Sequence, residues 1–146
     1  MIDVRQANSS LVLYDILVNS VEFKMSEGYK NLKDENLKFG FVSDIYESED
    51  GSIYKITTTT TISNEGNKDL DIKLVMSGYF GLKNEDSINE ERKDHLIERN
   101  TLTIMFPYIR SYITNLTAQS GGKPIIIPPI NINALLKEDP EYKEVK

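Results

Sequence analysis

The chain reads SIYKITTTTTIS from Ser52 to Ser63, which alternates apolar and polar side chains over one uninterrupted run. In an extended chain Tyr54, Ile56 and Ile62 fall on one face, and the lysine and alternate threonines fall on the other. Consecutive threonines favour a pleated strand over a helix, because branching at Cβ restricts their side-chain rotamers. This run therefore predicts a long β-strand with one buried face.

Turn residues flank this strand, and three more apolar runs surround it. Asp50-Gly51 precedes it and Asn64-Glu65-Gly66-Asn67 follows it, and both are typical of turns between antiparallel strands. Residues 37–46 and 70–82 also alternate, whereas residues 11–24 carry apolar side chains at both odd and even positions, which predicts a bulged strand. Four antiparallel strands in succession predict a meander.

The apolar pattern changes to helical spacing in the last third of the chain. From residue 101 to residue 120 apolar side chains recur every three or four positions, and a Gly-Gly pair ends the run. Pro107 is expected to kink this helix or to lie in its first turn. We expect the charged residues 87–100 to form a loop or an irregular helical lead-in. A proline-stiffened loop over residues 123–129 and a short helix over residues 131–137 should follow.

The order of the predicted elements indicates the fold class. Strands that precede helices predict an α+β domain and not a parallel α/β fold. The length is that of one domain, so residues 1–146 are expected to fold as a unit, with frayed ends at residues 1–10 and 138–146.

Composition argues against several classes of function. With 23 acidic against 17 basic residues the net charge is −6, which disfavours binding to nucleic acid. The sequence has no cysteine, no apolar run of roughly 18 residues and no signal-peptide pattern, so we expect a cytoplasmic protein without membrane insertion. The lone histidine, His95, makes a poor metal ligand or general base. We therefore expect no catalytic residue, metal or cofactor.

The last third of the chain is unusually poor in charge. Between Thr101 and Leu136 the charged side chains are Arg110 and Lys123, although a segment of this length at average charge would carry roughly ten. The helix face turned away from the sheet is therefore expected to be covered by a copy of the same helix. A monomer with an uncharged polar face is the alternative. The predicted interface residues are Ile104, Tyr108, Ser111, Tyr112 and Asn115.

Several spaced residues of this region resemble the SecB family of export chaperones. Met105-Phe106-Pro107-Tyr108-Ile109-Arg110, then Gly121-Gly122, then residues 125–129, Asn131 and Ala134-Leu135 follow the family pattern in order. Upstream, Ser77-Gly78-Tyr79-Phe80 resembles the end of the family's fourth strand. The resemblance extends from about residue 11 to residue 136.

The resemblance implies a SecB-like fold, in which a four-stranded antiparallel sheet packs with a long helix, a crossover loop and a short final helix. It further implies a homotetramer, a dimer of dimers, that binds unfolded polypeptides or preproteins without ATP in apolar grooves. For each groove residue ordinary core packing is the alternative. The implied groove residues are Leu37, Phe39, Phe41, Ile125, Ile126, Ile127, Ile132, Leu135 and Leu136.

One set of positions departs from the family. SecB proteins that deliver clients to the SecA motor use acidic side chains on the outer face of the sheet, and this sequence places Ser20, Lys24 and Lys73 there. Lost or reversed charge would repel a basic partner, so delivery to SecA is doubtful. The resemblance as a whole still makes a SecB-like homotetrameric chaperone for protein export the leading hypothesis. The alternative is a SecB-like chaperone dedicated to one partner, such as the antitoxin of a toxin–antitoxin pair, without SecA delivery.

Overall fold

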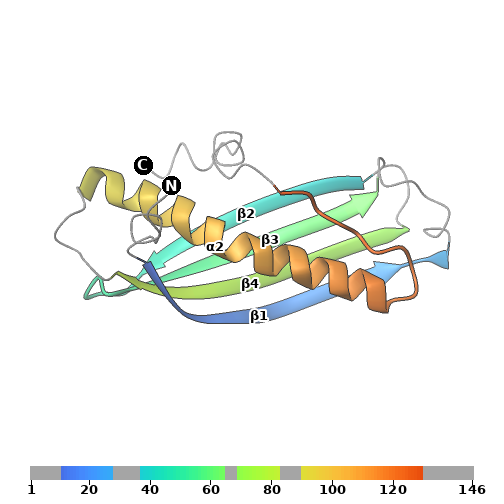
Figure 1. Cartoon of the computed structure of the whole chain (residues 1–146), viewed down its shortest axis with the longest axis horizontal. Coiled ribbons are helices and arrows are strands. Elements are labelled where there is room, and N and C mark those ends of the chain that lie inside the picture. Colours follow the sequence, from blue (N-terminus) through green and yellow to red (C-terminus); the bar gives the residue numbers. More distant parts are fainter. Residues whose placement is uncertain (1–10, 28–36, 65–68, 83–89, 130–146) are drawn as a thin grey trace, which may run out of the picture.

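The alternating segment forms β3 (Ile53–Asn64), a central strand of an antiparallel sheet. The computed structural model describes residues 11–27, 37–64, 69–82 and 90–129 (Figure 1). On β3 the side chains at even positions from Tyr54 to Asn64 are buried, and those at odd positions are wholly or partly exposed. The predicted burial of one face of this strand is thus confirmed.

Three more strands pair with β3 directly or through a neighbour. These are β1 (Leu11–Met25), β2 (Leu37–Glu47) and β4 (Leu70–Leu82). The strand order is β1-β4-β3-β2, and all pairs are antiparallel. The four-strand meander was therefore wrong in one respect, because β1 lies beside β4 and not beside β2. The 13 residues of β4 match the 15 residues of β1 better than the 11 of β2 do, so more backbone groups of β1 are paired.

The bulges expected in the first strand are present. The register between β1 and β4 shifts between Leu13 and Asp15 and again between Val18 and Ser20. A bulge adds one residue to one strand, so two successive side chains can point to the same face. This accounts for the apolar residues at both odd and even positions of β1.

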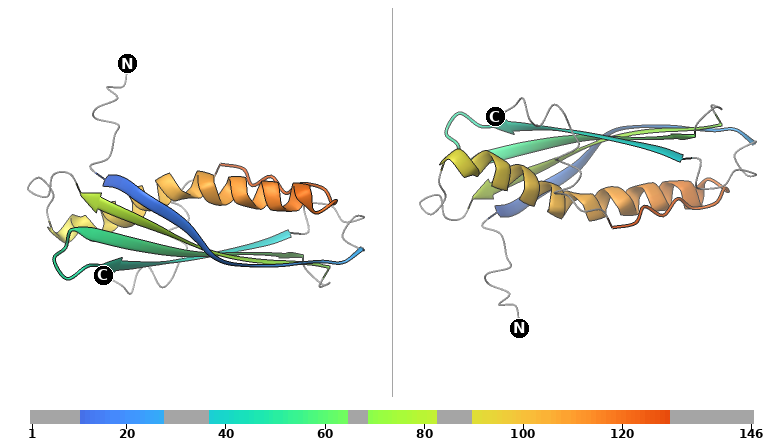
Figure 2. Two further views of the ribbon diagram at one scale, coloured as in Figure 1. Left: turned by 90° about the horizontal axis from the view of Figure 1, so that it is seen from below. Right: turned by 90° about the horizontal axis from the view of Figure 1, so that it is seen from above.

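One helix, α2 (Glu90–Gln119), covers one face of the sheet. It starts well before the predicted residue 101. Of the two expectations for residues 87–100, the loop is therefore wrong from Glu90 onward, and the helical lead-in is confirmed there as part of the regular helix. The missed signal was Ile97, which is buried and continues the apolar stripe of Leu102, Met105 and Ile109 toward the start of the helix. The two edge-on views of Figure 2 show α2 on one side of the sheet.

Pro107 lies inside α2 and not in its first turn. Proline has no N–H, so the carbonyl of Thr103 receives no intrahelical hydrogen bond from it. The helix ends at Gln119, and Gly121 follows with φ of 82°, the left-handed conformation that commonly terminates helices. The predicted Gly-Gly stop is thus confirmed.

The core lies between α2 and the inner face of the sheet, the face that α2 covers. Large residues from β3, β4 and α2 are completely buried there, including Ile56, Ile72, Phe80, Ile109 and Ile113. None of the helices in the described part of the chain is long and apolar enough to span a membrane. The predicted short helix at residues 131–137 lies outside the described residues.

Candidate functional site

The loop after α2, residues 123–129, turns back and runs along the helix above the sheet (Figure 1). Three side chains of α2 hold its backbone. Thr117 Oγ1 accepts a hydrogen bond from the Ile125 N–H at 2.8 Å, and Thr114 Oγ1 donates to the Ile125 carbonyl at 2.8 Å. Arg110 Nε donates to the Ile127 carbonyl at 2.8 Å.

These anchors fix the loop in an extended conformation with alternating side chains. Ile125 and Ile127 point into the core, with 5% and 7% of their surface exposed, whereas Ile126 is 75% exposed. The sequence interpretation missed the anchoring role of Arg110, Thr114 and Thr117. Their spacing, which places them along one side of a helix, was the available signal.

A second feature is an apolar strip on the inner face of β2, one of the two edge strands of the sheet. The rings of Phe39 and Phe41 lie nearly parallel, with an interplanar angle of 6° and centroids 6.5 Å apart. Phe41 also makes an edge contact with Phe106 of α2 at a centroid distance of 6.0 Å. Leu37, Phe39 and Phe41 pack against the core but remain partly exposed. We call these three residues the β2 strip.

The structure thus separates the residues that the resemblance assigned to the client groove. The three side chains of the β2 strip lie side by side and are partly exposed. Ile125 and Ile127 belong to the apolar core against which the strip packs. Ile126 points away from that core. Ile132, Leu135 and Leu136 lie outside the described residues. The groove assignment therefore remains a prediction, and its described, accessible part is the β2 strip.

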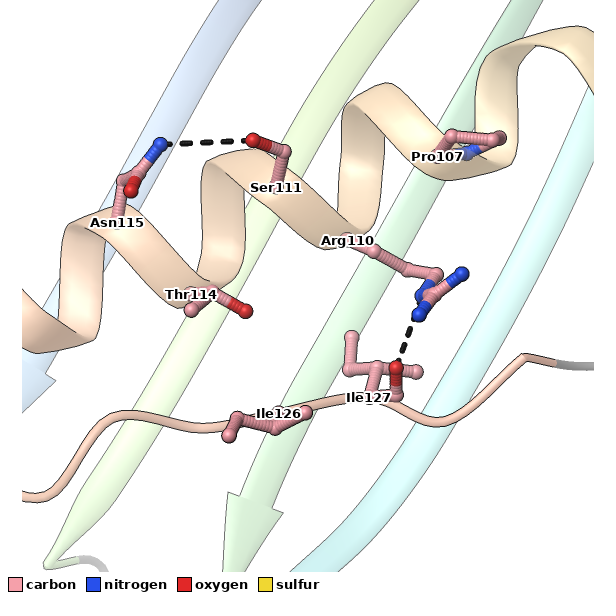
Figure 3. Close-up of a pocket in the computed structure, with 7 residues that line it drawn as sticks. All are labelled: Pro107, Arg110, Ser111, Thr114, Asn115, Ile126 and Ile127. Carbon is pink, nitrogen blue, oxygen red and sulfur yellow. Dashed lines mark hydrogen bonds between the residues drawn. The ribbon is translucent and has the colours of Figure 1, made fainter.

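Ile126 borders a different hollow, of about 320 Å³, between the loop and the outward face of α2 (Figure 3). Pro107, Arg110 and Thr114 line it from the helix, and Ile126 and Ile127 line it from the loop. One wall is therefore apolar, and the other carries an arginine and hydroxyl groups. The hollow adjoins the predicted oligomer interface, because Ser111 and Asn115 also line it.

The predicted interface residues divide into two groups. Tyr108, Ser111 and Asn115 are exposed, Tyr108 by 50%, and Asn115 Nδ2 lies 3.5 Å from Ser111 Oγ. Ile104 and Tyr112 are partly buried and pack against the core. An exposed face without charged side chains therefore runs along this part of the helix.

The three positions at which the resemblance predicts SecA docking are all exposed on the outer face, the face of the sheet opposite α2. In the register of β1 and β4, Lys73 lies directly opposite Glu22, and Lys24 lies opposite Asp71. Ser20 lies opposite Val75. The lysines thus face acidic partners across the strands, and this end of the sheet carries both signs of charge.

No group of three or more potential metal ligands occurs among the described residues, and the side chain of His95 lies outside the described part. In the described ranges one carboxyl group has a clearly shifted pKa. Hydrogen bonds from the Ser48 hydroxyl, the Ser52 hydroxyl and the Ser52 N–H lower the pKa of Asp50 to about 2. These contacts stabilise the turn between β2 and β3, where the predicted Asp-Gly pair places Gly51 at a φ of 73°.

An antiparallel sheet, one long helix and a loop that runs back along the helix define a class of small α+β domains. A solved structure of another protein shares this fold. A SecB-like chaperone of Mycobacterium tuberculosis, solved in complex with a ChAD peptide from the HigA1 antitoxin, shares the fold with a TM-score of 0.61 and 16% identity. The match covers 84% of this chain and 91% of that one.

The family model of SecB, described as preprotein translocase subunit, matches residues 6–142. The chain therefore belongs to the SecB family. The protein-export protein SecB of Neisseria meningitidis serogroup B is 29% identical over 121 residues, or 83% of this chain and 71% of that protein.

Other relatives match over a shorter span. An uncharacterized protein of Methanocaldococcus jannaschii is 36% identical over 67 residues, which cover 46% of this chain and 41% of that protein. The SecB of Azoarcus is 25% identical over 95 residues, which cover 65% of this chain and 63% of that protein. The chain thus matches less than two thirds of the length of these relatives.

Proposed function

We propose that this chain is an ATP-independent chaperone that holds unfolded polypeptides, preproteins for export among them, against the β2 strip. The observation that carries the proposal is the pair of nearly parallel, partly exposed phenylalanine rings on the inner face of an edge strand. Exposed aromatic surface of this kind is typical of interaction sites. Membership of a family described as preprotein translocase subunit supports this reading.

The edge position of β2 suits an extended client. β2 pairs with β3 on one side, and no described strand pairs with its other side. A client segment could therefore add to the sheet through its backbone while its apolar side chains contact Phe39 and Phe41. Such binding is largely independent of client sequence, as holding many unfolded chains requires. It uses no nucleotide, metal or other cofactor and no catalytic group, and we place it in the cytoplasm.

We further propose that the chain acts as a homotetramer, a dimer of dimers. Val18 and Val21 of the edge strand β1 lie opposite Met76 and Leu74, on the helix-bearing face, yet are 42% and 38% exposed. The uncharged helix face around Tyr108 is likewise open. Covering both surfaces with other copies of the chain would remove an unpaired strand edge and apolar surface from water. Several binding strips on one assembly would then hold a long client by avidity.

The test of holding measures binding of reduced, carboxymethylated α-lactalbumin, a permanently unfolded polypeptide, by fluorescence anisotropy. The double variant Phe39→Ser/Phe41→Ser removes the exposed part of two rings, worth about 1 kcal/mol each. We therefore expect binding roughly 30-fold weaker. Val42→Ser serves as the matched control, because Val42 lies on the opposite face of the same strand and is 41% exposed.

Equal binding by the double variant and the control would contradict the proposal, as would a requirement for ATP. The assembly is tested separately by sedimentation. The wild type should sediment as four chains, and Tyr108→Asp should reduce the mass by placing a charge on the helix face. A single chain at micromolar concentration in the wild type would exclude the tetramer.

A second candidate function is holding one dedicated partner, such as an antitoxin, without delivery to SecA. The structural relative bound to an antitoxin peptide favours it, and so do Lys24 and Lys73 at positions where SecA-delivering members carry acids. Calorimetry with a SecA tail peptide should then detect no micromolar binding. Capture of one cognate partner together with indifference to carboxymethylated α-lactalbumin would favour the dedicated role over general holding.

A further inference from the structure

The outer face of the sheet carries a cluster of tyrosines at the end far from the charged pairs described above. Tyr14 is 61% exposed and Tyr46 is 55% exposed, and Tyr79 is partly exposed. In the strand register Tyr79 and Tyr46 lie on either side of Lys55, and the 42% exposed Ile53 precedes Lys55 by two residues along β3. We call the three tyrosines, Lys55 and Ile53 the tyrosine patch.

Tyr14 reaches this face through the first bulge of β1. The register shift between Leu13 and Asp15 leaves Tyr14 without a partner on β4. A side chain built at Gly81 would overlap the Tyr14 ring, so the ring lies on the outer face above Gly81. A bulge that turns an aromatic ring away from the core, over a glycine that leaves room for it, adds no burial to the core. Bulges that re-aim a side chain are frequent next to binding sites.

Within the patch, two of the tyrosine rings already have a cation nearby. The Lys55 ammonium nitrogen lies 5.9 Å from the ring centroids of both Tyr46 and Tyr79. These are distances at which a cation is attracted to an aromatic face. Among the described residues no cation lies over the Tyr14 ring. One exposed ring of the patch is therefore open to a cation from outside.

The described residues that surround the patch are mostly acidic. Asp15 lies directly opposite Tyr79, and Asp44, two residues before Tyr46, is also exposed on the outer face. Glu49 and Asp50 follow in the exposed turn that leads to Ile53. Against these four carboxylates the patch holds one cation, Lys55. A positively charged partner is thus attracted to this end of the sheet, and an anionic one is repelled.

We propose that the tyrosine patch is a docking site for a basic, extended segment of another protein, with a lysine or arginine side chain on the Tyr14 ring. Asp15 would pair with that cation, and Ile53 would contact its aliphatic stem. The site is independent of client holding, because the β2 strip lies on the opposite face of the sheet. A protein bound here would leave the strip open, so one assembly could hold a client and a basic partner together.

The test uses two fluorescein-labelled peptides of ten residues, one alternating lysine and alanine and one alternating glutamate and alanine. Anisotropy should detect binding of the lysine peptide to the full chain and none of the glutamate peptide. Tyr14→Leu, which still covers Gly81, should weaken binding roughly two- to fivefold, the effect of one exposed cation–aromatic contact. Tyr14→Phe, which keeps the ring, should bind nearly as the wild type does.

Three results would overturn the proposal. The first is equal binding of both peptides, and the second is equal affinity of Tyr14→Leu and Tyr14→Phe, which would mean that the ring only covers Gly81. The third is an equal loss in Val42→Ser, which lies on the same face outside the patch. The Phe39→Ser/Phe41→Ser variant should bind the lysine peptide normally, so failure at the patch and failure of client holding remain distinguishable. Thermal melting of each variant confirms that it is folded.

Discussion

The hydroxyl of Thr117 holds the loop after α2, residues 123–129, in place through one buried hydrogen bond. Thr117 Oγ1 accepts from the Ile125 N–H at 2.8 Å and donates to the Ile113 carbonyl at 2.9 Å. Thr117 is 1% exposed and Ile125 is 5% exposed, so water does not replace the hydroxyl. Thr117→Val keeps the shape of the side chain and removes the acceptor.

The cost follows from the group that is left unpaired. The Ile113 carbonyl can keep its backbone partner in the helix, so losing the hydroxyl costs little there. The Ile125 N–H becomes a buried donor without an acceptor, which costs about 1–3 kcal/mol. At about 2 kcal/mol, and with the urea dependence of a small domain, the unfolding midpoint should fall by roughly 1 M urea.

Urea unfolding combined with hydrogen exchange of the Ile125 amide tests this prediction. Thr103→Val is the matched control, because Thr103 is exposed and its hydroxyl donates only within the helix, to the Arg99 carbonyl. The control should change stability by less than about 0.5 kcal/mol. If Thr117→Val behaves like the control, or if the Ile125 amide keeps its protection, the loop is not held by this hydrogen bond.

Three further predictions concern other parts of the fold. Gly78→Ala places a methyl group 2.7 Å from Phe80 Cε2 and 2.9 Å from Met105 Sδ. This contact should force α2 outward, and the free energy of unfolding should fall by about 1–3 kcal/mol. An unchanged urea midpoint would contradict this prediction. Arg110→Lys loses the planar donor to the Ile127 carbonyl, and exchange of the 125–127 amides should rise while α2 keeps its protection. Because the folded-state pKa of Asp50 is lowered to about 2, its contribution to stability is complete above its ordinary pKa and is lost as the pH falls toward 2. The stability difference between the wild type and Asp50→Asn should therefore shrink between pH 4 and pH 2, and a carboxyl titration near the ordinary value by NMR would refute the shift.

The strands were predictable because their evidence is local. Alternation on β3 fixed which side chains are buried, and the mixed pattern on β1 indicated its bulges before any partner was known. The apolar stripe and the Gly-Gly pair likewise predicted the helix and its end. The resemblance at residues 105–110 and 121–129 pointed to the family, and the family model confirms it.

The position of β1 in the sheet and the first residue of α2 were harder to predict from the sequence. Nothing in the local pattern of β1 says whether β2 or β4 is its neighbour, because either could pair with it. The start of α2 was hidden because the two apolar residues of this segment, Leu96 and Ile97, stand among charged ones and show no helical period. The resemblance also predicted Ser20, Lys24 and Lys73 as SecA-docking positions, but the sequence did not indicate that acids lie opposite the two lysines, since that pairing depends on register.

For the candidate site, too, some features were predictable from the sequence and others depended on the tertiary structure. By itself the sequence determined which residues are apolar and how they alternate, because that pattern depends on spacing along one chain. Only the tertiary structure decided that Ile126 turns outward while Ile125 and Ile127 join the core, because hydrogen bonds from Arg110, Thr114 and Thr117 set the loop's rotation. Which apolar side chains stay accessible depends on how far one helix can cover a four-stranded sheet. That is a property of packed layers and not of any single segment.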